Sequence, residues 1–158
     1  MGGAATKEET VPAVTKEADL YSWAVRQAEL LRAGRLGEID PHAIAEEIDD
    51  VGEEQYDKLA SELRVVMLHL LKWDRQPERR SRSWTASIRE HRRRALRQLR
   101  RNPGLKARLD EALVEAYEDA RDEAFIEPGL PLSTFPVARP FDYAETMERA
   151  IVWPGDED

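Results

Sequence analysis

Tryptophan and arginine side chains flank one short turn in the middle of this 158-residue chain. The turn carries five residues with binding chemistry: Trp73, Gln76, Arg80, Arg82 and Trp84. The two rings could close the end of a helical bundle, with arginine side chains stacked on them. Alternatively, Arg80, Arg82 and the backbone N–H groups at the start of the next helix could bind an anion.

The segment after the turn carries most of the basic charge. Residues 75–101 contain eleven arginines and two acids. If the apolar residues of this helix face a core, four arginines point outward: Arg89, Arg93, Arg97 and Arg100. That face could be solvated, could bind another protein, or could neutralise the phosphates of a nucleic acid. On its flanks lie Arg92, Arg94 and Arg101, which could meet acidic residues of the neighbouring helices.

The acidic residues are clustered as well, and the formal net charge of the chain is −8. Residues 38–54 contain eight acids and no lysine or arginine, and residues 110–127 contain eight acids and one arginine. A chain of this charge repels a polyanion. We therefore predict a non-enzymatic regulatory or protein-interaction module whose partner is another protein or a second copy. Nucleic-acid or small-anion binding is the alternative.

His69 lies in the most apolar stretch, "VVMLHLL", on the same side of its helix as Glu62. These two could form a buried polar pair, with His69 as a neutral core histidine that donates to a carbonyl or carboxylate. A general acid or base in a polar pocket, and therefore an enzyme, is the further alternative. No histidine has metal-ligand spacing, and no phosphate or dinucleotide loop is present, so we expect no metal and no cofactor.

Helical periodicity positions these residues. Residues 1–17 are polar and aperiodic, which predicts disorder, and residues 155–158 form an acidic tail. Between them, residues 18–154 are expected to form one all-α domain, a compact bundle of four main helices and a short C-terminal one. The helices are predicted over residues 19–33, 41–73, 83–101, 103–127 and 142–150.

The ends of these helices carry local signals. Asp19, Asp40 and Asp142 are predicted N-caps, and Gly34 is a predicted C-terminal stop. The apolar spacing is irregular at Gly52, which predicts a kink or break in the long central helix.

Two further patterns concern packing. Four alanines, spaced four residues apart from Ala112 to Ala124, predict a smooth ridge against which another helix can pack closely. The proline-rich stretch "PGLPLSTFPVARPF" predicts an extended connection. The chain has no cysteine and no run of about 18 apolar residues. We therefore expect a cytoplasmic protein that does not contact the membrane.

Several blocks of the sequence resemble a bacterial family catalogued as domain of unknown function number twenty-nine. They are "DLYSWAVRQAELLRAGRLGEID", "AEEIDDVG", "LLKWDRQPERRSRSWTASIREHRRR" and "GLPLSTFP". The resemblance extends over about residues 19–154 and implies a compact, all-helical domain. It implies no activity and no catalytic residues.

Overall fold

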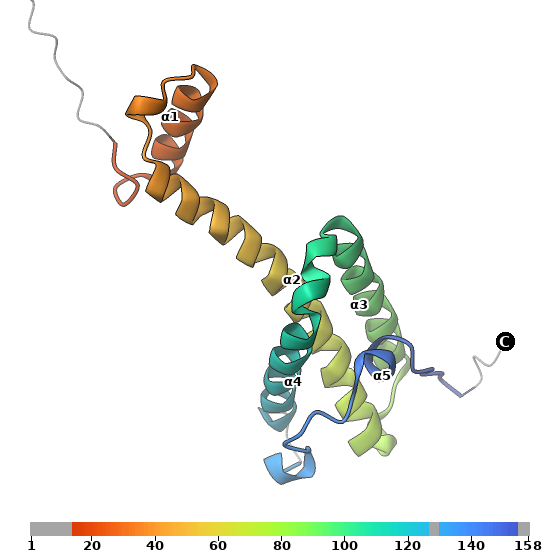
Figure 1. The fold of residues 1–158 in the computed structure, drawn as a ribbon. Helices are drawn as coiled ribbons and strands as arrows, with labels where there is room; N and C mark the ends of the chain where they lie inside the picture. Colours follow the sequence, from red (N-terminus) through yellow and green to blue (C-terminus); the bar gives the residue numbers. More distant parts are fainter. Residues whose placement is uncertain (1–13, 127–129, 155–158) are drawn as a thin grey trace, which may run out of the picture. The chain divides into compact units, whose positions relative to one another are not determined.

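The structure is a computed structural model that describes residues 14–126 and 130–154 (Figure 1). Over these ranges the chain contains helices and no strand, which confirms the all-α prediction. The predicted disordered segment lies outside the described residues over positions 1–13, and the predicted acidic tail lies outside them entirely. The α-helices are α1 (Leu20–Arg32), α2 (Pro41–Arg75), α3 (Arg82–Arg101), α4 (Leu109–Ile126) and α5 (Tyr143–Met147). The 3₁₀ turns are η1 (Leu36–Glu38), η2 (Pro77–Arg79), η3 (Pro103–Arg108) and η4 (Leu132–Thr134).

The chain divides into two compact units, residues 1–50 and 51–158. Nothing in the sequence indicated this division, and one domain was expected over residues 18–154. In the first unit, α1 buries Trp23 and Leu30. The side chain of Gln27 accepts a 2.8 Å hydrogen bond from the backbone N–H of Asp40, just before α2. The second unit contains most of α2 and all the helices that follow. No helix of the described residues is long and apolar enough to cross a membrane.

The local signals at the helix ends operate as predicted. Asp19, Asp40 and Asp142 each accept a hydrogen bond from a backbone N–H in the first turn of the helix that follows, at 2.8–3.0 Å. Gly34 has φ 69° and ends α1. The N–H groups of Gly34 and Arg35 return to the carbonyls of Leu31 and Leu30, which is the Schellman pattern.

The break expected near Gly52 is absent, because α2 is α-helical without interruption from Pro41 to Arg75. Gly52 keeps a negative φ, and a Cβ added there would meet nothing within 4 Å. The irregular apolar spacing instead coincides with the boundary between the two compact units, at Asp50 and Val51. A change of packing partner along one helix alters the apolar pattern just as a break would.

Two other helix boundaries differ from prediction. The segment predicted as one helix over 103–127 begins with the 3₁₀ turns of η3, and α4 begins at Leu109. Gly104, next to Pro103, disfavours α-helix and is compatible with this tighter start. The predicted end at residue 127 lies outside the described residues. The last helix is shorter than predicted, since α5 spans Tyr143–Met147.

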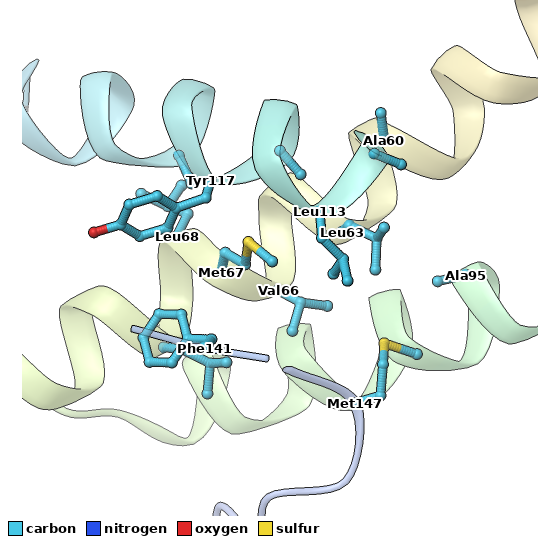
Figure 2. Close-up of a cluster of buried hydrophobic side chains, with 14 of the residues drawn as sticks. Ala60, Leu63, Val66, Met67, Leu68, Ala95, Leu113, Tyr117, Phe141 and Met147 are labelled. Atoms are coloured by element: carbon cyan, nitrogen blue, oxygen red, sulfur yellow. The ribbon is translucent and has the colours of Figure 1, made fainter. Parts of the chain in front are cut away.

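One hydrophobic core, contributed by α2, α3 and α4, fills the second unit (Figure 2). The stretch Val66–Leu71 of α2 carries apolar side chains on all sides of the helix and is buried, as its composition predicts, with Val66, Met67 and Leu70 each 0 % exposed. The predicted alanine ridge is confirmed, because Ala112, Ala116, Ala120 and Ala124 are all 0 % exposed.

The proline-rich connection contributes to this core rather than only linking helices. Phe135 and Phe141 lie within it and are buried, and Met147 of α5 packs in the same cluster. Tyr117 of α4 packs edge-on against Phe141, with ring centroids 6.3 Å apart, and its hydroxyl donates a 2.6 Å hydrogen bond to the carbonyl of Pro136. These contacts hold the connection against α4.

Replacing Tyr117 with phenylalanine is expected to lower the free energy of unfolding by about 0.5–1.5 kcal/mol near neutral pH, because the partly buried hydrogen bond to the Pro136 carbonyl is lost. Burial also raises the pKa of Tyr117 above its usual value. The stability that the neutral phenol contributes is therefore complete below about pH 10, the unfolded value, and is lost as the pH rises through the folded pKa. Urea unfolding at neutral and alkaline pH measures both effects.

The matched control is Tyr21→Phe, at a tyrosine that is 79 % exposed. It should leave the stability and its alkaline decline unchanged. If Tyr117→Phe declines as steeply as the wild type at alkaline pH, the assignment of this titration to Tyr117 is wrong.

Candidate functional site

The turn between α2 and α3 is packed around its two tryptophans. Trp73 is 7 % exposed, and the guanidinium of Arg80 lies 4.7 Å from its ring centroid. The Nε–H of Arg80 also donates to the carbonyl of Trp73 at 2.9 Å. Arg80 therefore stacks on the ring and satisfies a carbonyl at the end of α2. Arg82 lies exposed at the start of α3.

Lys72, which was not among the predicted site residues, lies under the second tryptophan. It is 8 % exposed, and its Nζ lies 4.6 Å from the ring centroid of Trp84. The edge of the His69 ring packs on the same tryptophan, with centroids 6.5 Å apart. The spacing of three residues between His69 and Lys72 would have placed them on one helical surface.

Gln76 is the most enclosed polar residue of this turn, at 3 % exposed. Its Oε1 is buried and has no hydrogen-bond partner among the residues that the structure describes. Most buried polar atoms in folded proteins are paired, so this acceptor is an unusual feature of the turn.

The structure brings Glu62 to His91. The Nδ1–H of His91, on α3, donates to the Glu62 carboxylate at 2.5 Å and joins α2 to α3. His69, the predicted partner of Glu62, uses its own Nδ1–H to donate to the carbonyl of Val65 at 2.8 Å. This carbonyl bond was one of the options left open for His69.

The arginines of α3 have three different environments. The guanidinium of Arg92 donates to the carbonyls of Thr146 and Arg149 at 2.8 and 2.7 Å, at the C-terminal end of α5. Arg93 and Arg94 both pair with Glu90 on their own helix. The hydrogen bond from Arg94 is the main cause of a lowered pKa at Glu90, with the charge of Arg93 adding to it.

Arg92 therefore donates to backbone carbonyls and not to an acid of a neighbouring helix. Arg94 pairs with Glu90, one turn away on its own helix, and the negative charge of Glu62 on α2 also acts on it. Pairs between helices involve other arginines: Arg64 with Glu123 joins α2 to α4, and Arg108 reaches Glu53 at 2.7 Å.

The remaining outward arginines are exposed. Within residues 14–126 and 130–154, no acidic side chain pairs with Arg89, Arg97 or Arg100. Leu96 lies among them on α3 and is 40 % exposed. We define the α3 face as Leu96 together with the four predicted arginines, which are Arg89, Arg93, Arg97 and Arg100.

A groove between α2 and α3 adjoins this face. Its volume is about 180 Å³, and it is lined by Lys58, Glu62, Arg94, Arg97, Gln98 and Arg101. Gln98 is held in place because its amide donates to the backbone carbonyl of Gln55 at 2.9 Å. Lys58 and Gln98 were not predicted as site residues, since nothing in the sequence shows which residues of α2 lie opposite α3.

The described residues contain no group of three or more His, Cys, Asp or Glu side chains arranged to hold a metal ion. The side chains of the α3 face can contact both carboxylates and an apolar group. Arginine forks present paired donors to carboxylates, and an exposed leucine between them offers an apolar contact.

The family resemblance noted in the sequence is confirmed by a direct comparison. A family model, described as Domain of unknown function DUF29, matches residues 16–152. Neither a curated protein nor a solved structure matches the chain. The matched range includes the turn, the α3 face and the groove. The chain therefore belongs to the family Domain of unknown function DUF29.

Proposed function

We propose that this domain is a non-enzymatic protein-interaction module, and that it binds an acidic protein surface through the α3 face. The observation that carries the proposal is Leu96, an apolar side chain that is 40 % exposed inside a surface of arginines. It lies three residues after Arg93 and four before Arg100, so the three side chains share one helical surface.

The charge around Leu96 is available for a partner. Arg97 and Arg100 have no acidic partner among the described residues, and the Arg93–Glu90 pair is on the surface. An exposed ion pair contributes only about 0–1 kcal/mol, so Arg93 can exchange Glu90 for another carboxylate at little cost.

A protein partner fits this face better than a nucleic acid. Protein interfaces combine an apolar centre with a polar rim, and arginine is enriched in them. A phosphate backbone has no apolar group to place on Leu96. The net charge of −8 also repels a polyanion, whereas a local acidic patch on a protein responds to the nearby arginines.

The groove beside the face supports the same function. Arg97 belongs to both surfaces, and Arg94, Arg101 and Lys58 surround the opening. The carboxylate of Glu62, also in the lining, is held by His91. A volume of about 180 Å³ admits a single acidic side chain from a partner that covers Leu96.

The test is site-specific photocrosslinking from position 96 of the full chain in cells. We expect protein adducts from position 96, with the crosslinked peptide, mapped by mass spectrometry, rich in Asp and Glu. These adducts should fall at least severalfold when Arg97 and Arg100 are changed to glutamate, because charge complementarity at the interface is then reversed.

The control is the same crosslinker at Val114, an exposed apolar residue of α4 among acidic neighbours. It should give none of these adducts. In parallel, a labelled oligonucleotide is titrated at low salt. Salt-sensitive oligonucleotide binding that requires Arg97 and Arg100, without protein adducts from position 96, would overturn the proposal in favour of a nucleic-acid ligand.

A further inference from the structure

We infer that the groove between α2 and α3 is a phosphate-binding site, and that the side chain which the acidic partner inserts into it is a phosphorylated serine or threonine. The inference rests on the proposed function, because it names the group that a partner covering Leu96 places beside the α3 face. All six residues that line the groove belong to the second unit, so the site lies within one compact part of the molecule.

Two hydrogen bonds between α2 and α3 hold the walls of the groove together. The side-chain amide of Gln98 donates to the backbone carbonyl of Gln55 at 2.9 Å, and His91 donates to the carboxylate of Glu62 at 2.5 Å. These bonds fix the separation of the two helices along the groove. A ligand therefore meets a preformed opening, and little ordering of the backbone is required when it binds.

The lining of the groove has an excess of positive charge, although the chain as a whole has a net charge of −8. Four of the six lining residues are basic and Glu62 is the one acid among them, which leaves an excess of three positive charges. A carboxylate side chain brings one negative charge, whereas a phosphorylated side chain brings about 1.5–2 at pH 7. The groove therefore matches a phosphate better than a carboxylate.

The four basic side chains are available to a ligand. Among the residues that the structure describes, no acid pairs with Arg97 or Arg101. Lys58 and Arg94 each pair with an acid one turn away on the same helix, at 2.9 and 2.8 Å. Exposed pairs of this kind contribute little to stability, so both side chains can turn toward a phosphate.

The bases approach the opening from two helices. Arg94, Arg97 and Arg101 follow one another at intervals of three and four residues, so they share one surface of α3. Lys58 contributes to the same lining from α2. A phosphate monoester has three terminal oxygens in a tetrahedral arrangement and can accept from donors on several sides, whereas the two oxygens of a carboxylate lie in one plane.

A phosphate carried by a protein fits this position better than a nucleic acid or an anionic membrane. Arg97 belongs to both the groove and the α3 face, next to Leu96, so the group in the groove is part of the molecule that covers Leu96. A volume of about 180 Å³ admits one phosphate group rather than a run of them. The net charge of −8 opposes an extended polyanion, whereas a single phosphate responds to the bases around it.

Fluorescence polarisation with the full chain tests the inference. Three labelled peptides contain a leucine flanked by aspartates, and differ only in having phosphoserine, serine or glutamate at one neighbouring position. We expect the phosphoserine peptide to bind at least about tenfold more tightly than the other two. Changing Lys58 and Arg101 to glutamine leaves the α3 face intact. This change should remove the preference for phosphoserine and weaken binding of the glutamate peptide far less.

The matched control is Arg75→Gln with Lys106→Gln, which removes two positive charges at exposed positions outside the groove and the α3 face. This variant should keep the preference for the phosphoserine peptide. Circular dichroism verifies that each variant keeps its helices. A phosphoserine peptide that binds no more tightly than the glutamate peptide overturns the inference, and so does a preference that survives the change of Lys58 and Arg101.

Inorganic phosphate, added as a competitor, separates a phosphorylated protein from a small phosphate compound. We expect it to displace the phosphoserine peptide only at concentrations far above the Kd of the peptide, because free phosphate makes no contact with Leu96. If inorganic phosphate binds as tightly as the peptide, the groove takes a small phosphate compound and the inference of a phosphorylated partner is overturned.

Crosslinking from position 96 separates this inference from the proposed function. If the adducts are acidic but contain no phosphoserine or phosphothreonine, and the phosphoserine peptide is not preferred, the proposed function stands and the inference fails. If position 96 gives no protein adduct and none of the peptides binds, both fail. Adducts that contain phosphoserine or phosphothreonine, and that are lost when Lys58 and Arg101 are changed, support both.

Discussion

Replacing Phe135 with alanine is expected to lower the free energy of unfolding by about 3–5 kcal/mol. The ring is 1 % exposed and lies in the core of the second unit, although the chain around it is a proline-rich connection. Alanine removes the apolar contacts and leaves a cavity that the packed helices can fill only in part. Urea unfolding, followed by circular dichroism, measures the loss.

Phe125→Ala is the control for this prediction. Phe125 is 50 % exposed on α4, so its truncation should cost about 0.5 kcal/mol or less. Equal losses for the two variants would show that the ring of Phe135 does not pack in the core.

Replacing Arg92 with methionine should cost about 1.5–3 kcal/mol, because its charged guanidinium donates to backbone carbonyls at the end of α5. Burial and the nearby positive charge of Arg149 lower the pKa of Arg92, but an arginine stays charged at any pH of interest. Methionine keeps the apolar stem and provides no donor, so the carbonyls of Thr146 and Arg149 lose their partner. Urea unfolding measures the stability, and limited proteolysis measures the opening of residues 142–152.

Arg89→Met, at an exposed position on the same helix, is the matched control and should change neither measurement. The assignment fails if Arg92→Met unfolds at the wild-type urea concentration and its C-terminal segment resists the protease as well as the wild type does.

Features of the fold that depend on neighbouring residues could be predicted from the sequence. Asp19, Asp40 and Asp142 cap their helices because each side chain reaches an N–H only a few residues away. Gly34 ends α1 because a positive φ costs glycine little. The alanine ridge is visible for the same reason, since its period of four is close to one helical turn.

Features that depend on distant residues could not be predicted. The carbonyl partners of Arg92 lie more than fifty residues further along the chain, and a helical wheel shows only that Arg92 is on a flank. Phe135 precedes Pro136 and Phe141 follows Pro140, in a stretch where no periodicity marks a buried position. The uninterrupted helix at Gly52 was mistaken for a break because a change of packing partner disturbs the same apolar pattern.

For the candidate site too, local features could be predicted from the sequence and contacts with distant residues could not. The outward direction of Arg89, Arg97 and Arg100 follows from the wheel alone, and the structure leaves all three exposed. Whether they have acidic partners depends on which helices lie nearby, so it required the structure. Leu96 was missed because an apolar residue in a helical sequence is ordinarily assigned to a core.

The alanine ridge also bears on how α4 keeps its place along α2. Because the alanines repeat at about one turn, sliding α4 along its axis by four residues would place each alanine at the position of the next, at almost no steric cost. The alanines alone therefore do not distinguish these two registers of α4, but the large residues beside the ridge do. The same slide would carry Tyr117 away from Pro136 and bring Arg121 into its place in the core. The alanines therefore let a neighbouring helix approach α4 closely, while Tyr117 fixes α4 in a single register.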